Sequence, residues 1–235
     1  MQNTNESAAK EIEIQHVIAA SDMYQLLSRF LHLPTEEISI GILGGSLAED
    51  VREIFEELGV DNSRTREIQS RLRALQEETS GKSDYLSALR QEYTRLFTHP
   101  RNPVIDIYET YFLFQPEEGG QDKPALFISP AALDAERRYK QAGLTRAKEF
   151  NEPGDHMATE LEFMAYLYLQ LAKALLEDNP EGIFQRKEQI KEFTEIHLQK
   201  WAREFFNRCT ADSQMEVYQI YGLIGSTFLN KMLGR

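Results

Sequence analysis

Cysteine and basic residues are both scarce in this chain. Its 235 residues include one cysteine, Cys209, and 26 Lys or Arg against 38 Asp or Glu, a formal net charge of −12. A single cysteine forms no intramolecular disulfide and cannot supply a cysteine-rich zinc site, so we expect a reducing compartment, the cytoplasm. Because nucleic-acid binding needs a basic face, the charge argues against DNA or RNA as the main partner.

Long apolar runs are also absent. The N-terminal stretch MQNTNESAAKEIEIQ has no apolar core and places Glu6, Glu11 and Glu13 where a secretory signal would carry Lys or Arg. The longest late uncharged run, between Glu216 and Lys231, is shorter than the roughly 20 residues that a spanning helix needs. We therefore expect no export signal and no stable membrane insertion.

Common catalytic motifs are missing as well. The sequence has no GxGxxG, GxxxxGK[ST], GxSxG or HExxH pattern. A di-iron site needs two Glu-x-x-His pairs, and only Glu13 and His16 have that spacing. We interpret Cys209 as a packed apolar group. The sequence thus predicts no catalytic residue, no metal and no cofactor.

Helical periodicity, by contrast, runs through most of the chain, and no segment alternates like a strand. Ser46 and Glu49 have the spacing of a capping box, and Ser129 and Pro130 that of an N-cap followed by proline. We expect helices near residues 11–33, 47–58, 68–75, 86–97, 130–143, 161–176, 180–205 and 212–228.

The most apolar of these segments is 161–176, where 13 of the 16 residues are aliphatic, aromatic or Ala. A helix that is apolar on nearly all sides belongs in the middle of a bundle. We predict an all-α fold, with residues 1–235 forming a single helical bundle around this central helix.

Periodicity disappears between residues 98 and 129. This stretch is rich in Pro and Gly yet keeps a dense set of aromatic residues. A structureless loop of this length is uncommon in a compact domain and is often functional or mobile. We expect it to expose aromatic groups to a partner, and long hinge-like loops also permit a domain-swapped dimer.

Two groups of residues are candidates for a binding site. Helix capping alone explains an acid and a histidine at the start of a helix, and Asp155 is a candidate N-cap. An aromatic stripe at helical spacing, such as Leu96 and Phe97, usually belongs to the core. A polar cluster beside an apolar helix also suits a peptide that is cationic at one end and apolar at the other. The polar cluster is Glu152, Pro153, Asp155, His156 and Glu160, and the aromatic group is Tyr93, Leu96, Phe97, Pro103, Tyr108 and Glu109.

Five short motifs follow one another along most of the chain. They are Leu26-Leu-Ser-Arg-Phe30, Tyr93-Thr-Arg-Leu-Phe97, Tyr108-Glu-Thr-Tyr111, Glu152-Pro-Gly-Asp-His156 and His197-Leu-Gln-Lys-Trp201. In this order they resemble the TorD/DmsD family of redox-enzyme maturation chaperones. The element that leads into the apolar helix, Glu152 to His156, is the most specific part of the resemblance.

The resemblance implies an all-helical chaperone without catalytic activity. It further implies that the chain binds the twin-arginine signal peptide and the apo form of a molybdopterin-containing oxidoreductase subunit, assists cofactor insertion and delays export. Asp155 and His156 match the polar pair of the family's peptide site, Tyr93, Leu96 and Phe97 its aromatic helix, and Pro103, Tyr108 and Glu109 the loop alongside. His99 and Arg101 depart from residues that some members carry.

Two alternatives stay open at this point. One is an assembly chaperone of the nitrate-reductase type, which serves a molybdoenzyme that is not exported. The other is a helical enzyme in which Asp155 and His156 perform acid–base chemistry, which would need a concave pocket around them.

Overall fold

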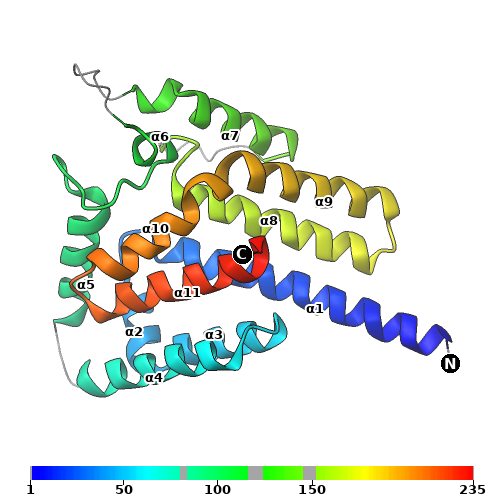
Figure 1. Ribbon diagram of the computed structural model, residues 1–235, viewed down its shortest axis with the longest axis horizontal. Helices are drawn as coiled ribbons and strands as arrows, with labels where there is room; N and C mark the ends of the chain where they lie inside the picture. Colours follow the sequence, from blue (N-terminus) through cyan, green and yellow to red (C-terminus); the bar gives the residue numbers. More distant parts are fainter. Residues whose placement is uncertain (1, 80–83, 116–123, 145–151, 235) are drawn as a thin grey trace.

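The computed structural model describes residues 2–79, 84–115, 124–144 and 152–234 (Figure 1). Its α-helices are α1 (Gln2–Arg29), α2 (Glu36–Gly44), α3 (Ser46–Glu57), α4 (Asn62–Thr79), α5 (Tyr85–Tyr93), α6 (Glu109–Phe112), α7 (Pro130–Gln141), α8 (Met157–Leu176), α9 (Pro180–Phe193), α10 (Gln199–Asp212) and α11 (Glu216–Leu233). Within these residues the one β pairing is an isolated bridge between Tyr108 and His156. The all-α prediction is confirmed.

The apolar segment lies inside the bundle, as predicted. It forms α8, which packs between α1 and α9 (Figure 1). Leu161, Met164 and Leu167 of this helix are fully buried. The continuous apolar character of this helix thus follows from its having neighbours on several sides.

The buried side chains form one large and one small cluster. The large cluster draws on helices from α1 to α11. The small one joins Val17 of α1 to Leu171, Ala172 and Leu175 of α8. Helix α8 belongs to both clusters and connects the main core to a three-helix extension made with α1 and α9. The assignment of residues 1–235 to a single domain stays a prediction.

Several predicted boundaries are wrong. Helix α2 is not among the helices predicted from the sequence. Only Gly45 (φ 85°) separates it from α3, and Gly45 therefore takes the N-cap position of α3. The capping box at Ser46 and Glu49 therefore does not form: Ser46 lies inside α3 and its hydroxyl donates to the Gly41 carbonyl. Residue 212 ends α10 rather than opening α11.

The 98–129 stretch is more ordered than predicted. It contains α6 and a short 3-10 helix, Leu126–Ile128, although residues 116–123 lie outside the described part of the chain. The predicted cap at its end is confirmed: the Ser129 hydroxyl accepts from the Ala132 amide at 3.1 Å, and Pro130 opens α7.

Two helices continue through single π-helical turns. Thr94–Thr98 extends α5, and Thr194–Leu198 joins α9 to α10. A π turn inserts one extra residue and is frequently found at functional sites. The second of these turns places His197 in the protein interior, where it is 1% exposed.

Among the described residues, we find no helix that combines the length and the apolar character needed to cross a bilayer.

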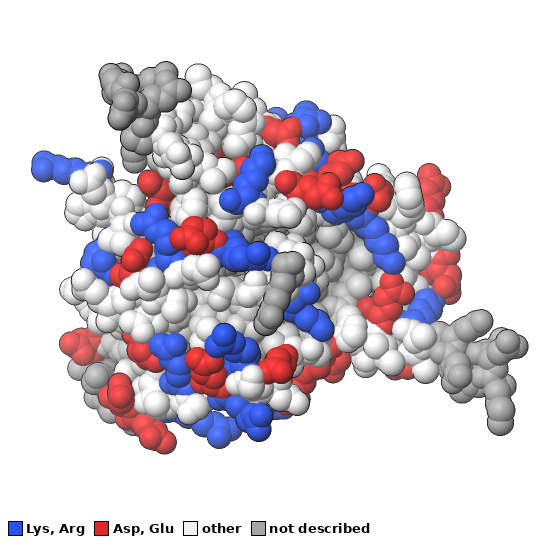
Figure 2. Space-filling model, in the orientation of Figure 1, with Lys and Arg blue, Asp and Glu red and all other residues white. Residues whose placement is uncertain are grey.

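Charged side chains of both signs are interspersed on the face shown in Figure 2. Acidic and basic groups lie next to one another there (Figure 2). On α3, Arg52 forms ion pairs with Glu49, Glu53 and Glu56. Exposed pairs of this kind contribute little to stability. The acidic excess of the sequence is therefore not gathered into one large patch on this face.

Helices α10 and α11 approach closely because α11 carries glycine at the crossing. A Cβ atom built on Gly222 would lie 2.5 Å from the carbonyl oxygen of Phe206 and 2.5 Å from the amide nitrogen of Thr210. Real Cβ atoms do not come this near to backbone atoms, so any side chain here must push the two helices apart.

We therefore expect Gly222→Ala to destabilise the protein by about 2 kcal/mol, the usual cost of overpacking. Urea unfolding followed by circular dichroism measures this. The matched control is Gly44→Ala at the exposed end of α2, where nothing lies within 4 Å of the added Cβ. It should leave stability unchanged or raise it by up to about 1 kcal/mol. Equal effects in the two variants would contradict the close approach of α10 and α11.

Candidate functional site

The structure brings Tyr108 and Glu109 of the aromatic group against the polar cluster, but not the rest of that group. The segment before α6 runs antiparallel to the segment before α8. The Glu109 amide donates to the Asp155 carbonyl and the Met157 amide to the Ile107 carbonyl, both at 2.9 Å. The Tyr108–His156 bridge lies between these two bonds. We call this pairing of residues 107–110 with residues 152–157 the junction.

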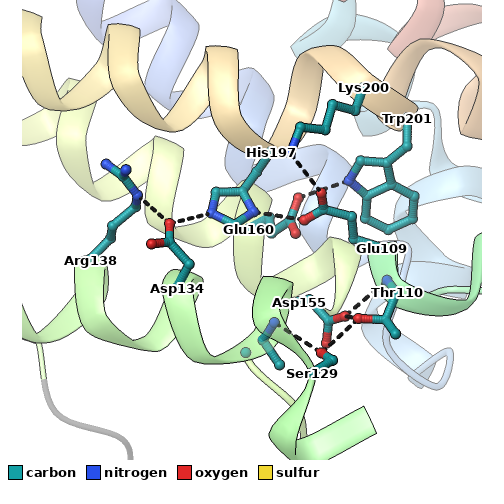
Figure 3. Close-up of polar contacts among 12 residues, drawn as sticks. Glu109, Thr110, Ser129, Asp134, Arg138, Asp155, Glu160, His197, Lys200 and Trp201 are labelled. Atoms are coloured by element: carbon teal, nitrogen blue, oxygen red, sulfur yellow. Dashed lines mark hydrogen bonds and ion pairs between the residues drawn. The ribbon is translucent and has the colours of Figure 1, made fainter. Parts of the chain in front are cut away.

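Asp155 is the centre of the junction (Figure 3). Its Oδ2 accepts from the Thr110 amide at 3.0 Å and lies 2.5 Å from the Thr110 hydroxyl, which is 2.7 Å from the Ser129 hydroxyl. Ser129 in turn caps α7. Asp155 thus connects the first turn of α6, the start of α7 and the entry to α8.

Burial raises the pKa of the Asp155 carboxyl, against the lowering effect of the Thr110 hydrogen bonds. Its second oxygen, Oδ1, is buried without a hydrogen-bond partner. Asp155 is therefore held by the fold and is not presented to solvent.

His156, and not Asp155, is the N-cap of α8. Its Nδ1 accepts from the Ala158 amide at 3.1 Å, which requires an unprotonated nitrogen at that position. Burial lowers the pKa of His156 to about 4. The prediction of Asp155 as N-cap is wrong because the Asp155 side chain is turned toward α6.

A second polar network extends from the junction across α10 and α7 (Figure 3). Both ring nitrogens of His197 face carboxylates: Nδ1 lies 2.7 Å from Glu109 Oε2, and Nε2 lies 3.1 Å from Asp134 Oδ2. Arg138 donates to Asp134 at 2.6 Å, and Lys200 Nζ lies 3.8 Å from Glu109 Oε1.

The hydrogen-bond partners of Asp134 strongly lower its pKa. Burial alone would raise the pKa of Asp134, but hydrogen bonds from Arg137, Arg138 and His197 outweigh it and hold that pKa well below its usual range. Asp134 is thus an ionised anchor that fixes the orientation of the His197 ring.

Glu160 lies on the other side of Glu109 and is completely buried. Trp201 Nε1 donates to its Oε2 at 3.1 Å, and its Oε1 has no partner. Burial, and then the nearby Glu109 carboxylate, raise the pKa of Glu160 well above its usual value. A neutral Glu160 satisfies this arrangement, because two enclosed carboxylates at close range do not readily ionise together.

Three buried residues of this network, Glu109, Glu160 and His197, also have the side-chain types of a cation site. Ligand atoms of Glu109, Glu160 and His197 all lie within 4.8 Å of one another. Carboxylate oxygens and imidazole nitrogen are common ligands of Zn²⁺, and a metal-binding histidine typically has its other nitrogen on a carboxylate, as His197 has on Asp134. The group can accept either a proton or a divalent cation.

Most of the predicted site residues are buried. Only Glu152 is exposed, and Pro103 and Tyr108 are partly exposed. The Tyr108 hydroxyl donates to Glu152 at 2.5 Å. The buried ones are Tyr93, Leu96, Phe97, Glu109, Pro153, Asp155, His156 and Glu160.

Tyr93, Leu96 and Phe97 take the core position that an aromatic stripe usually has. Phe97 stacks on Phe205 with ring centroids 5.8 Å apart, and the Tyr93 hydroxyl donates to the Leu31 carbonyl. These three side chains belong to the core and are not on the surface of the junction.

Sequence reasoning misses seven residues of these networks. The residues that are not among the predicted site residues are Thr110, Ser129, Asp134, Arg138, His197, Lys200 and Trp201. Thr110 and His197 lie inside the quoted motifs, which is the signal that could have found them. Asp134 has no such signal, because its partner His197 is 63 positions away.

We expect His156→Asn to change the pH dependence of stability. Asn retains an N-cap acceptor but does not titrate. In the wild type the folded pKa is below the unfolded one, so stability is lost as pH falls from about 6.5 to about 4. Urea unfolding at several pH values should give a slope that is shallower in the variant by up to about 1.4 kcal/mol per pH unit. An unchanged slope would contradict a buried neutral imidazole.

For Glu160 we compare two variants. If the carboxyl is neutral, Glu160→Gln keeps the acceptor for Trp201 and leaves stability at pH 7 equal to the wild type or higher. Because the folded pKa is raised, wild-type stability falls as pH rises above about 4.5, and the variant removes that slope.

Glu160→Ala should instead cost about 2 to 4 kcal/mol, because it leaves a cavity and an unsatisfied Trp201 N–H.

Thermal denaturation with and without added Zn²⁺ shows whether the group of Glu109, Glu160 and His197 holds a proton or a divalent cation. A cation site would show a wild type stabilised by Zn²⁺ and a Glu160→Gln variant that is not.

Comparison with known proteins places the chain in a family. Residues 60–207 match the family described as nitrate reductase delta subunit. The chain is 27% identical over 203 residues to a perchlorate reductase assembly chaperone protein of Dechloromonas aromatica, an alignment that covers 86% of this chain and 82% of the relative.

Two further relatives align over a shorter region. The chain is 29% identical over 114 residues to the chaperone protein TorD of Photobacterium profundum, covering 46% of this chain and 51% of the relative. It is 31% identical over 103 residues to a selenate reductase assembly chaperone protein of Thauera selenatis, covering 44% and 51%. The chain thus spans about half the length of these two relatives.

The family match covers the junction, α7, α8 and most of α10. These relatives are named as TorD or as a reductase assembly chaperone, which agrees with the resemblance of the five motifs to the TorD/DmsD family. The chain therefore belongs to the nitrate reductase delta subunit family, and its resemblance to the TorD chaperones is confirmed.

Proposed function

We propose that the chain is a cytoplasmic assembly chaperone for the catalytic subunit of a molybdopterin-containing oxidoreductase. The observation that carries the proposal is the alignment over 86% of the chain with a perchlorate reductase assembly chaperone protein. The chaperone binds the apo subunit, assists cofactor insertion and delays export until folding is complete. Where the client has a twin-arginine signal peptide, the chaperone binds that peptide as well.

The junction contributes to this function in two ways. Its buried residues, Asp155, His156 and Glu109, position the loop before α6 against the start of α8. Glu152 and Tyr108, with Pro103 nearby in sequence, are the residues that a client can touch. This division follows from burial, since a client cannot reach a carboxylate that is fully enclosed.

One observation favours a second candidate. The matching family is described by a nitrate reductase subunit. An assembly chaperone of that type would serve a molybdoenzyme that stays in the cytoplasm, and no signal peptide would then be involved. The two candidates differ only in whether the client has a twin-arginine leader.

The enzymatic alternative has little support. Asp155 accepts hydrogen bonds from Thr110, and His156 caps α8. Neither side chain is offered to a substrate, and the relatives are named as chaperones.

The test is to co-express the chain with the catalytic subunit of a molybdoenzyme from the same organism and to purify the complex by size exclusion. We expect a stable complex with the apo subunit that dissociates when cofactor is inserted. Deletion of the client's first residues should weaken the complex if a leader is recognised and leave it unchanged for the nitrate-reductase type. Failure to bind either apo form would contradict the proposed function.

A further inference from the structure

Glu109, Glu160 and His197 come from three segments that meet only in the folded chain. Glu109 is the first residue of α6, Glu160 lies in the first turn of α8, and His197 lies in the π-helical turn between α9 and α10. All three are at most 2% exposed. Glu109 and His197 alone are 88 positions apart, so no ligand spacing in the sequence could reveal this group.

Glu160 brings to this group a carboxylate oxygen that has no partner. Trp201 Nε1 donates to Glu160 Oε2 at 3.1 Å, whereas Oε1 is buried without a hydrogen-bond partner among the described residues. In Figure 3 the Glu160 carboxylate is directed toward Glu109 and His197, and one ligand atom of each residue lies within 4.8 Å of the other two. An enclosed polar atom without a partner is rare in native proteins and calls for a ligand or a proton.

The outer side of the group is already held by other residues. His197 Nε2 lies 3.1 Å from Asp134 Oδ2, which leaves Nδ1 facing Glu109 at 2.7 Å. Trp201 holds the outer oxygen of Glu160 in the same way. Metal-binding side chains typically have such partners, because these fix the ring and the carboxylates in the orientation that the metal needs.

The charge around the group favours a divalent cation. The side chains of Glu109, Asp155 and Glu160 are all enclosed, and Lys200 is the only Lys or Arg of the described chain that we find in contact with these three carboxylates, 3.8 Å from Glu109 Oε1. Burial, and then the Glu109 and Asp155 carboxylates, raise the pKa of Glu160. A divalent cation compensates two enclosed carboxylates at once, whereas a proton neutralises only one.

We propose that Glu109, Glu160 and His197 form a binding site for a divalent transition-metal cation such as Zn²⁺. Imidazole nitrogen beside carboxylate oxygens suits Zn²⁺ better than Mg²⁺ or Ca²⁺, which prefer oxygen ligands alone. Bonds of about 2.0 to 2.2 Å place the ligands of a tetrahedral Zn²⁺ roughly 3.4 Å apart, so small side-chain rotations close the 4.8 Å spread. The cation takes the place of the proton on Glu160.

The cation connects the start of α6 directly to α8 and to the π turn. Glu109 follows Tyr108, which with Glu152 is the part of the junction that a client can touch. A bound cation therefore holds this exposed part in place. Only this consequence rests on the proposed function, since the metal site itself is independent of it.

The experiment uses the full chain, both native and refolded from urea with metal present, because an enclosed site is filled during folding. Competition with a chromophoric chelator measures Zn²⁺ affinity, and we expect one Zn²⁺ per chain. Glu160→Gln and Glu109→Gln keep the size of the side chain and should each weaken binding by at least about 100-fold, more than the usual cost of losing an outer partner. Circular dichroism checks that both variants fold.

Co²⁺ serves as a spectroscopic probe of the wild type. Its visible absorption bands depend on the type of ligand and on the coordination geometry. We expect bands typical of mixed nitrogen and oxygen ligands in a site of low coordination number. This spectrum tests the proposal even where a variant does not fold, because bands of the hexa-aqua ion alone would contradict it.

The matched control is Glu162→Gln. Glu162 lies on α8 two positions after Glu160, but its carboxylate is exposed and lies 3.3 Å from His32 Nε2. This surface pair also offers a carboxylate and an imidazole to added metal, so the variant detects adventitious binding. It should leave Zn²⁺ affinity within about twofold of the wild type, because only an exposed, screened charge is lost.

Several results would overturn the proposal. They are a wild type that binds no Zn²⁺ in either preparation, equal affinity of the wild type and Glu160→Gln, and loss of binding in Glu162→Gln alone. Binding of Mg²⁺ or Ca²⁺ as tight as that of Zn²⁺ would contradict the ligand chemistry. If the chain binds Zn²⁺ at this site but no apo subunit, the metal site stands and the chaperone function fails.

Discussion

The pairing of Asp155 with Thr110 is the interaction on which the site depends. Three segments far apart in the sequence meet there: the start of α6, the start of α7 and the entry to α8. Each begins with backbone N–H groups that have no partner within their own helix. The Asp155 carboxylate accepts from the Thr110 amide and the Ser129 hydroxyl accepts from the Ala132 amide, and these bonds fix the start of α6 and the start of α7.

The buried network beyond Asp155 illustrates how a helical protein can enclose several charges. Asp134 is ionised because two arginines and His197 surround it, whereas Glu160 has only Trp201 as a donor and a carboxylate as neighbour. An unpaired charge in the interior is far more costly than a neutral carboxyl. The same type of side chain is therefore charged at one end of the network and neutral at the other.

The sequence predicts what depends on local pattern. Helix α8 is predictable because nearly every side chain in it is apolar, and α7 because Ser129 and Pro130 are a strong start signal. Helix α2 escapes prediction because it has only nine residues and two of them are glycines, Gly41 and Gly44. The motifs locate the junction but cannot show that Asp155 and Glu160 are enclosed, since burial depends on what other segments place above them.

The π turn between α9 and α10 sets a constraint on how this chain can vary. Loss of one residue from Thr194–Leu198 would restore regular α-helix and rotate everything after it by about 100° relative to α9. Trp201 and Phe205, both enclosed now, would then face another direction while His197 left its two carboxylates. The length of this segment is thus as much a part of the site as the identity of its residues, and a single deletion there would act like several core substitutions at once.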